Sequence, residues 1–214
     1  MDNAKLNQED FYQLDILSEE TPQQYLENLE HFKLQYPAVR SIAHLEYFQA
    51  KALVCLRRFE EAIQLAIDLL GKAVVQRDFY LLVKCNILLS KCYYNSELKY
   101  RAKACLELAE EYAKASQDVE LLATALSTFG SFLLDNNDDK AAQKYLLKAV
   151  SLILKLPSSL TTVSVLTRAA SLFHSRQDYD KVILYLGTAL KMSRKAKLIV
   201  SELNIISNLV IILG

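Results

Sequence analysis

The chain has 214 residues, of which 25 are Lys or Arg and 25 are Asp or Glu, so its formal net charge is zero. This balance gives no support to nucleic acid or an anionic membrane surface as a partner. The polar, acidic start at residues 1–13 lacks the basic residues and apolar run of a secretory signal. The aliphatic stretch at residues 209–213 is too short to span a bilayer. We therefore expect a cytoplasmic protein with no membrane segment.

The first part of the chain predicts two helices. Apolar residues between Phe11 and Leu17 indicate a short helix. Thr21-Pro22 is a start signal for a second one, with Thr as the cap and Pro in the first turn. We interpret residues 1–40 as an N-terminal helical cap, a degenerate half-repeat, because the terminal repeat of an array must cover an otherwise exposed apolar face.

Four segments that follow share one pattern at a spacing of 40 residues. Small residues form one column, and large apolar residues form a second column three positions later: Ala50, Ser90, Gly130 and Ala170, then Leu53, Tyr93, Leu133 and Phe173. Two more columns are small or apolar: Ala62, Ala102, Ala142 and Val182, then Leu69, Ala109, Ala149 and Ala189. A fixed period of this kind is typical of a solenoid, which works through its surface. The alternative is a non-repetitive helical bundle in which the alanines align by chance.

Each repeated unit predicts two helices and a short turn. In the third unit, apolar residues recur at helical spacing up to Leu133, the run Asp135–Asp139 breaks the pattern, and a second helix follows. No strand-like alternation is present, so we expect an all-α chain. The expected array covers residues 41–214, with units at about 41–78, 79–118, 119–158 and 159–198 and then an unpaired helix at 199–213.

These columns resemble the tetratricopeptide repeat (TPR) family. The second helix of its repeat opens with an aromatic residue three positions before an alanine, as at Phe59 to Ala62, and Tyr179 to Val182 comes close. Lys99 and Asp139 depart from the aromatic position, and the period exceeds the family's usual ~34 residues. Longer units occur in bacterial regulatory proteins and kinesin light chains. The resemblance implies a right-handed α-α superhelical solenoid of TPR-like helix pairs.

The family resemblance also implies a concave groove lined by the first helix of each pair. The residues at the matching positions, or one turn beyond them, include His44, Tyr47, Lys51, Lys84, Lys91, Tyr94, Asn95, Thr128, Ser131, Arg168 and His174. None is acidic, so we expect a groove that is cationic in its first half and rich in hydroxyls in its second half. Such a lining suits a protein or peptide partner that is acidic or has a free C-terminal carboxylate. The alternative is that the lysines are ordinary solvated residues.

The last predicted helix is apolar on nearly all sides. Ten of the fifteen residues from 199 to 213 are aliphatic, and a helix of this kind needs neighbours on both flanks. We expect an oligomer or next-domain interface at Ile205, Ile206, Leu209, Ile212 and Leu213. The chain is then either a fragment of a longer protein or a protein that self-associates through this helix.

The sequence contains no catalytic signature. Phosphate-binding, zinc-protease and serine-hydrolase motifs are absent, and the three histidines lie far apart. The four cysteines form no CxxC pair, so we interpret them as buried apolar residues in a reducing compartment rather than as a metal or redox cluster. We expect no metal and no cofactor.

Two functions remain open for a chain of this kind. The first is a protein-interaction module that binds a peptide or partner segment in its groove and has no enzymatic activity. The second is an N-terminal sensory or regulatory segment of a larger bacterial signalling protein, with a GGDEF-type cyclase or DNA-binding output domain. No constellation of residues supports a third, an enzyme.

Overall fold

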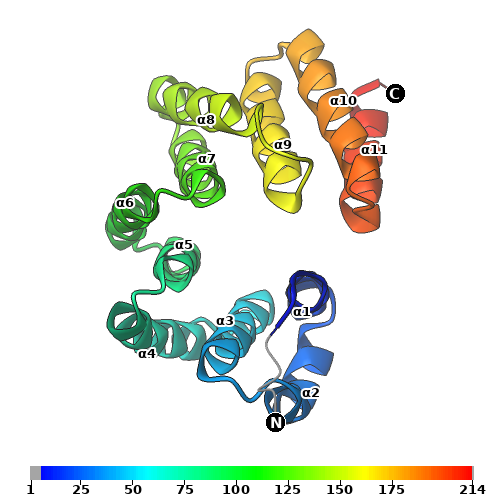
Figure 1. Ribbon diagram of the computed structural model, residues 1–214. Helices are drawn as coiled ribbons and strands as arrows, with labels where there is room; N and C mark the ends of the chain where they lie inside the picture. The colour runs from blue at the N-terminus through cyan, green and yellow to red at the C-terminus, as the bar shows by residue number, and fades with distance from the viewer. Residues whose placement is uncertain (1–5, 214) are drawn as a thin grey trace. The chain divides into compact units, whose positions relative to one another are not determined.

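The computed structural model describes residues 6–213, and within that range the chain is all α-helix and turn, as predicted (Figure 1). The helices are α1 (Gln8–Glu20), α2 (Pro22–Gln35), α3 (Val39–Cys55), α4 (Phe59–Gln76), α5 (Phe79–Asn95), α6 (Lys99–Ser116), α7 (Val119–Asp135), α8 (Asp139–Ile153), α9 (Leu160–Ser175), α10 (Tyr179–Lys195) and α11 (Ile199–Leu213). They form two compact units, Met1–Tyr112 and Ala113–Gly214, which divide near the end of α6. No helix in the described range is long and apolar enough to cross a membrane.

Short turns with one left-handed residue join consecutive helices from α3 to α8 and from α9 to α11. These residues, with φ near +60°, are Arg57, Arg77, Glu97, Gln117, Asn137, Gln177 and Lys197. A non-glycine residue in this conformation costs about 1–2 kcal/mol, and hydrogen bonds at the helix end offset it. The residue after Asn137 shows how: the Asp138 amide donates to the Leu133 carbonyl at 2.9 Å, and the Asp138 carboxylate accepts from the Ala141 amide at 3.2 Å. The predicted break at 135–139 is therefore confirmed as a turn.

The first unit is held together by α3, which contacts α1, α2, α4 and α5. Tyr25 of α2 is fully buried, and its hydroxyl donates to the Leu45 carbonyl of α3 at 2.8 Å. Phe11 of α1 meets Phe48 of α3 edge to face, with ring centroids 4.9 Å apart. The two N-terminal helices thus pack on α3, and the N-terminal cap stays a prediction, of which residues 1–5 lie outside the described range.

The second unit packs by close approach of paired helices. α7 lies against α8 and α9, while α10 lies against α9 and α11. At Gly130 of α7, an added Cβ would come within 2.6 Å of Cγ and 3.2 Å of the backbone nitrogen of Leu146 in α8. The small column of the sequence is therefore explained here, because a larger residue would push the two backbones apart.

Gly130→Ala should destabilise the protein although alanine has the higher helix propensity. The new methyl group must displace Leu146, and overpacking of this kind costs about 1–3 kcal/mol. Gly187 of α10 is the matched control, because a Cβ there meets nothing within 4 Å, and Gly187→Ala should stabilise the helix by about 1 kcal/mol. Urea unfolding of both variants measures the difference. An equal effect of the two substitutions would contradict close packing at Gly130.

Candidate protein-interaction surface

In the first unit, α1 supplies acidic partners for a predicted groove cation. Lys51 of α3 is paired with Asp15 at 2.5 Å and with Glu19 at 3.0 Å, both from α1, and its side chain is only 15% exposed. Lys51 is therefore part of an internal ion network, and the expectation of an acid-free cationic half does not hold at this position. Asp15 and Glu19 are four residues apart on one face of the short helix, but the sequence does not show which helix that face meets.

His44 and Tyr47 also lie inside the first unit. The His44 ring packs edge to face on Phe11 and Tyr80, with centroids 5.3 and 5.4 Å apart, and its Nε2 is 3.5 Å from the Asp78 carboxylate. Tyr47 is buried, and burial, followed by the nearby Tyr80 and Asp15 charges, raises the pKa of its hydroxyl well above the usual range. These two side chains shape the core beneath the surface and leave little area for a partner.

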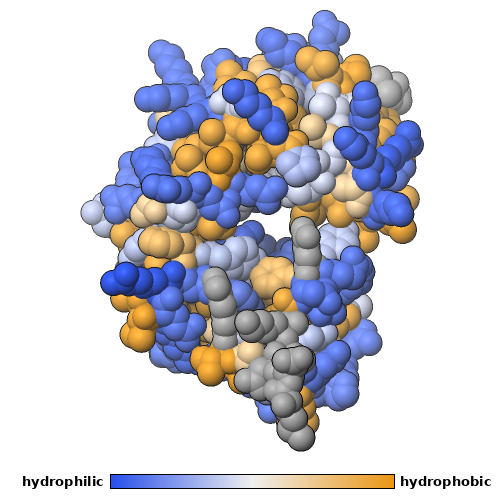
Figure 2. Space-filling model, viewed as in Figure 1, coloured by the Kyte–Doolittle hydropathy of each residue, from blue (hydrophilic) through white to orange (hydrophobic). Residues whose placement is uncertain are grey.

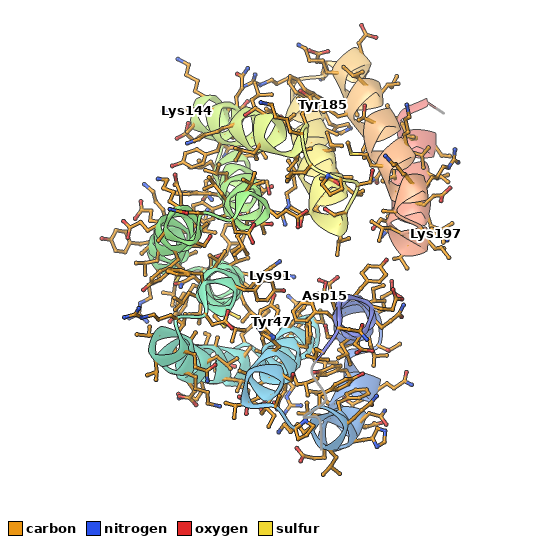
Figure 3. The ribbon with its side chains drawn as sticks, viewed as in Figure 1. Asp15, Tyr47, Lys91, Lys144, Tyr185 and Lys197 are labelled. Carbon is orange, nitrogen blue, oxygen red and sulfur yellow. The ribbon has the colours of Figure 1, made fainter. Side chains whose placement is uncertain are left out.

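The predicted groove positions on α5 are more exposed to solvent. Lys91 and Asn95 are exposed, while Lys84 and Tyr94 are half-buried. The Lys84 amino group lies over the Tyr80 ring, 5.5 Å from its centroid. The amino group of Lys91 makes no hydrogen bond or ion pair with the part of the chain that the structure describes, and Figure 3 shows this residue on the same side of the unit as Asp15 and Tyr47.

In the second unit, α7 and α9 lie side by side and present a row of hydroxyl groups. We call this surface the α7–α9 face and define it by Thr124, Thr128, Ser131, Thr167, Arg168 and Ser171. The Arg168 guanidinium of α9 donates to Thr128 Oγ1 of α7 at 2.9 Å and links the two helices. Thr128, Ser131 and Arg168, three of the predicted site residues, are thus on one surface.

Five hydroxyls of this face donate hydrogen bonds to carbonyls of their own helices. Thr124, Thr128 and Thr167 donate to carbonyls of their own helices at 2.8, 2.8 and 2.9 Å, and Ser131 and Ser171 do the same at 3.1 and 3.3 Å. Because each proton is used, the oxygen lone pairs are what remain for a partner. The face therefore offers hydrogen-bond acceptors, which suit the N–H groups of a peptide backbone.

Arg168 also has a carboxylate near it. Partial burial raises the pKa of Asp135 at the end of α7, and the positive charge of Arg168 offsets part of this rise. The α7–α9 face therefore has both an acidic and a basic group beside its hydroxyls. Asp135 was not among the predicted site residues, since the sequence placed it in a turn. His174 is exposed at the end of α9, where its ring meets Tyr179 with centroids 6.2 Å apart.

The cysteines are mostly buried. Burial raises the pKa of the Cys85 thiol, with a smaller contribution from Asp78, to about 12, and it raises those of Cys92 and Cys105 to about 11. Cys55 is exposed. Within the described part of the chain, no group of three or more His, Cys, Asp or Glu residues could hold a metal ion.

The predicted interface residues of α11 have different surroundings. Ile205 is 1% exposed and packs within the second unit. Ile206, Leu209 and Ile212 are half-buried, and the side chain of Leu213 lies outside the described residues. The exposed aliphatic residues of α11 are instead Ile199, Leu203, Val210 and Ile211, which are 60–78% exposed. A view of the surface shows apolar and polar side chains interspersed (Figure 2).

Comparison with solved structures identifies the fold as TPR-like. BtubC (BKLC) from P. vanneervenii superposes with a TM-score of 0.61 at 19% identity, covering 86% of this chain and 74% of BtubC. A Rap protein in complex with competence and sporulation factor gives 0.68 at 15% identity, covering 89% of this chain and 56% of the Rap protein. The TPR-like repeats of a putative kinesin light chain from Podospora anserina give 0.56 at 14% identity, covering 87% and 96%.

No protein-family model matches this sequence, and no curated protein matches it significantly. The resemblance to the TPR-like fold predicted from the repeated columns is confirmed.

Lys51→Met should weaken the packing of α1 on α3. The substitution leaves the half-buried Asp15 carboxylate, and the exposed carboxylate of Glu19, without their cation, at a cost of about 1–3 kcal/mol. In this variant, hydrogen exchange in α1 should become faster than in the unmodified protein, whereas exchange in α7 should stay the same. Lys103→Met is the control, because Lys103 faces Glu107 at 3.8 Å on the open surface, where a pair contributes about 0–1 kcal/mol. Unchanged protection of α1 in the Lys51 variant would contradict the anchoring role.

In the folded protein, one cysteine should react with a thiol reagent and the other three should not. At pH 8 the exposed Cys55 should react with Ellman's reagent, whereas Cys85, Cys92 and Cys105 are buried and protonated because their pKa values are raised to about 11–12. All four should react after unfolding in guanidinium. Fast reaction of more than one thiol in the folded protein would contradict the burial of Cys85, Cys92 and Cys105.

Proposed function

We propose that the chain is a cytoplasmic protein-interaction module that binds an extended peptide segment on the α7–α9 face. The observation that carries the proposal is the row of five hydroxyls whose protons are already donated within their helices. Their free lone pairs accept hydrogen bonds, and a peptide in extended conformation presents N–H groups at regular intervals.

Arg168 is the proposed anchor for a carboxylate. A guanidinium has five donors, and the hydrogen bond to Thr128 uses one of them. The planar guanidinium matches the two oxygens of a carboxylate from an acidic side chain or a free C-terminus. Asp135 lies near the same guanidinium, so an incoming carboxylate takes over part of its interaction with Arg168.

A second contact is proposed for acidic partners on the first unit. Lys91 is exposed and Lys84 half-buried on α5, and both are positively charged at neutral pH. We propose that these lysines attract acidic segments of a partner. Lys51 is left out of this contact because Asp15 and Glu19 already pair with it.

The comparisons support an interaction role at the level of the fold. One of the structurally similar proteins, the Rap protein, was crystallised with competence and sporulation factor bound. Proteins built from stacked helix pairs present extended surfaces on which partners dock. Similarity at 15% identity does not show that this chain binds the same ligand. The nature of the ligand is therefore inferred from the surface of this chain.

The test starts from a phage-displayed library of disordered protein segments. We expect the chain to select segments that carry an Asp, Glu or C-terminal carboxylate at one fixed position. Arg168→Ala should weaken the affinity for a selected peptide at least tenfold, measured by titration calorimetry, which corresponds to about 1.4 kcal/mol. Lys84→Glu combined with Lys91→Glu should weaken the binding of acidic segments to the first unit.

Arg176→Ala is the matched control for the arginine. Arg176 follows α9 and bonds to Gln143 and to the Asp139 carbonyl, away from the hydroxyl row. Its removal should leave the affinity unchanged. Selection of no peptide, or equal loss in the Arg168 and Arg176 variants, would contradict the proposal.

A further inference from the structure

A stripe of aliphatic side chains is uncovered along α11. Ile199, Leu203 and Val210 are 69%, 60% and 64% exposed, and Ile206 is half-buried between them. The four residues are 4, 3 and 4 positions apart, so they lie on one side of the helix in the spacing of a coiled-coil seam. The opposite side of α11, which includes Ile205, packs within the unit.

The equivalent side of the other first helices is covered by a helix. In α7 the matching Ala123, Leu126 and Gly130 are buried, and Gly130 lies directly against Leu146 of α8. In α9 the matching Val163, Leu166 and Ala170 are 1–3% exposed, and α10 packs on that helix. The stripe on α11 is therefore a surface built to receive a helix.

Val210 determines what kind of helix fits. It stands where the other first helices have Ala50, Ser90, Gly130 or Ala170, the residues that let a paired helix approach closely. A β-branched residue keeps the incoming backbone further away, at the distance where aliphatic side chains interlock from both helices. The occupant should thus present its own aliphatic stripe of similar size.

We propose that the occupant is α11 of a second copy of this chain, in antiparallel orientation. Ser207 beside the stripe is uncharged, and the one charged residue of α11, Glu202, bonds to Arg194 at 2.7 Å. Two copies therefore meet without like-charge repulsion. The pairing is independent of peptide binding on the α7–α9 face.

Charge complementarity sets the orientation. The exposed Lys195 and Lys197 precede α11, whose C-terminal half has no charged side chain. In an antiparallel pair these lysines lie beside the C-terminal end of the partner helix, where the helix dipole is negative. A parallel pair would bring the lysines of both copies together. Antiparallel alignment about Ile206 makes Val210 of the other copy the stripe residue nearest to Leu203 of the first.

Engineered cysteines test both the pairing and its direction. In a Cys55→Ser background, Ile206→Cys should form a covalent dimer on mild oxidation, as judged on a non-reducing gel. Val210→Cys alone should form little, whereas a mixture of Leu203→Cys and Val210→Cys proteins should form the crossed dimer. Efficient self-linking at Val210 would overturn the antiparallel arrangement.

Sedimentation equilibrium measures the pairing without cross-links. The unmodified chain should approach twice the mass of 24.3 kDa as its concentration rises, and Leu203→Glu should shift the mass to that of the monomer. Asn204→Glu, one position away on an uncovered part of the helix, should leave the dimer intact, and circular dichroism should show that both variants are folded. A monomer at every concentration, or a dimer that survives Leu203→Glu, would overturn the proposal.

Discussion

Close approach of paired helices is the constraint on which the rest of this structure depends. It is seen most directly at Gly130, where even a methyl group would collide with Leu146 of the neighbouring helix. Small residues such as Ala50 and Ala170 fill the same position in other pairs and are fully or almost fully buried. Because the second helix of each pair covers this side, the first helix keeps another side for contacts outside the pair.

The candidate surface follows from that division of faces. On α7 and α9 the remaining side has hydroxyls instead of large apolar residues, and each hydroxyl bonds back to its own helix. The surface is therefore polar without a demand for water or partner acceptors, and it can exchange water for peptide N–H groups at low cost. Arg168 adds direction, because it is tied to Thr128 across the two helices.

Much of the fold could be predicted from the sequence because its rules are local. The turn at 135–139 follows from residues that favour caps, and the small column marks the helix contacts. The ion network at Lys51 could not be predicted in the same way, because Asp15 and Glu19 come from a helix whose packing direction is a tertiary property. The acceptor character of Thr128 also needed coordinates, since a hydroxyl can donate or accept.

The last helix shows a second limit of pattern reading. Its sequence is aliphatic on nearly all sides, so composition alone does not tell which side is covered. In the structure Ile205 is buried within the unit, whereas Leu203 and Val210 are exposed. Only the packing of α10 against α11 could decide between these faces.

The central claim is that partners dock on the hydroxyl row of the α7–α9 face, and threonine methyl NMR tests it most directly. With methyl-labelled threonine, addition of a library-selected peptide should shift the signals of Thr124, Thr128 and Thr167. Thr188 of α10 should stay unchanged, because it lies on another helix and its hydroxyl bonds to the Leu184 carbonyl at 2.7 Å. Shifts at Thr188 with none at the three face threonines would contradict the account.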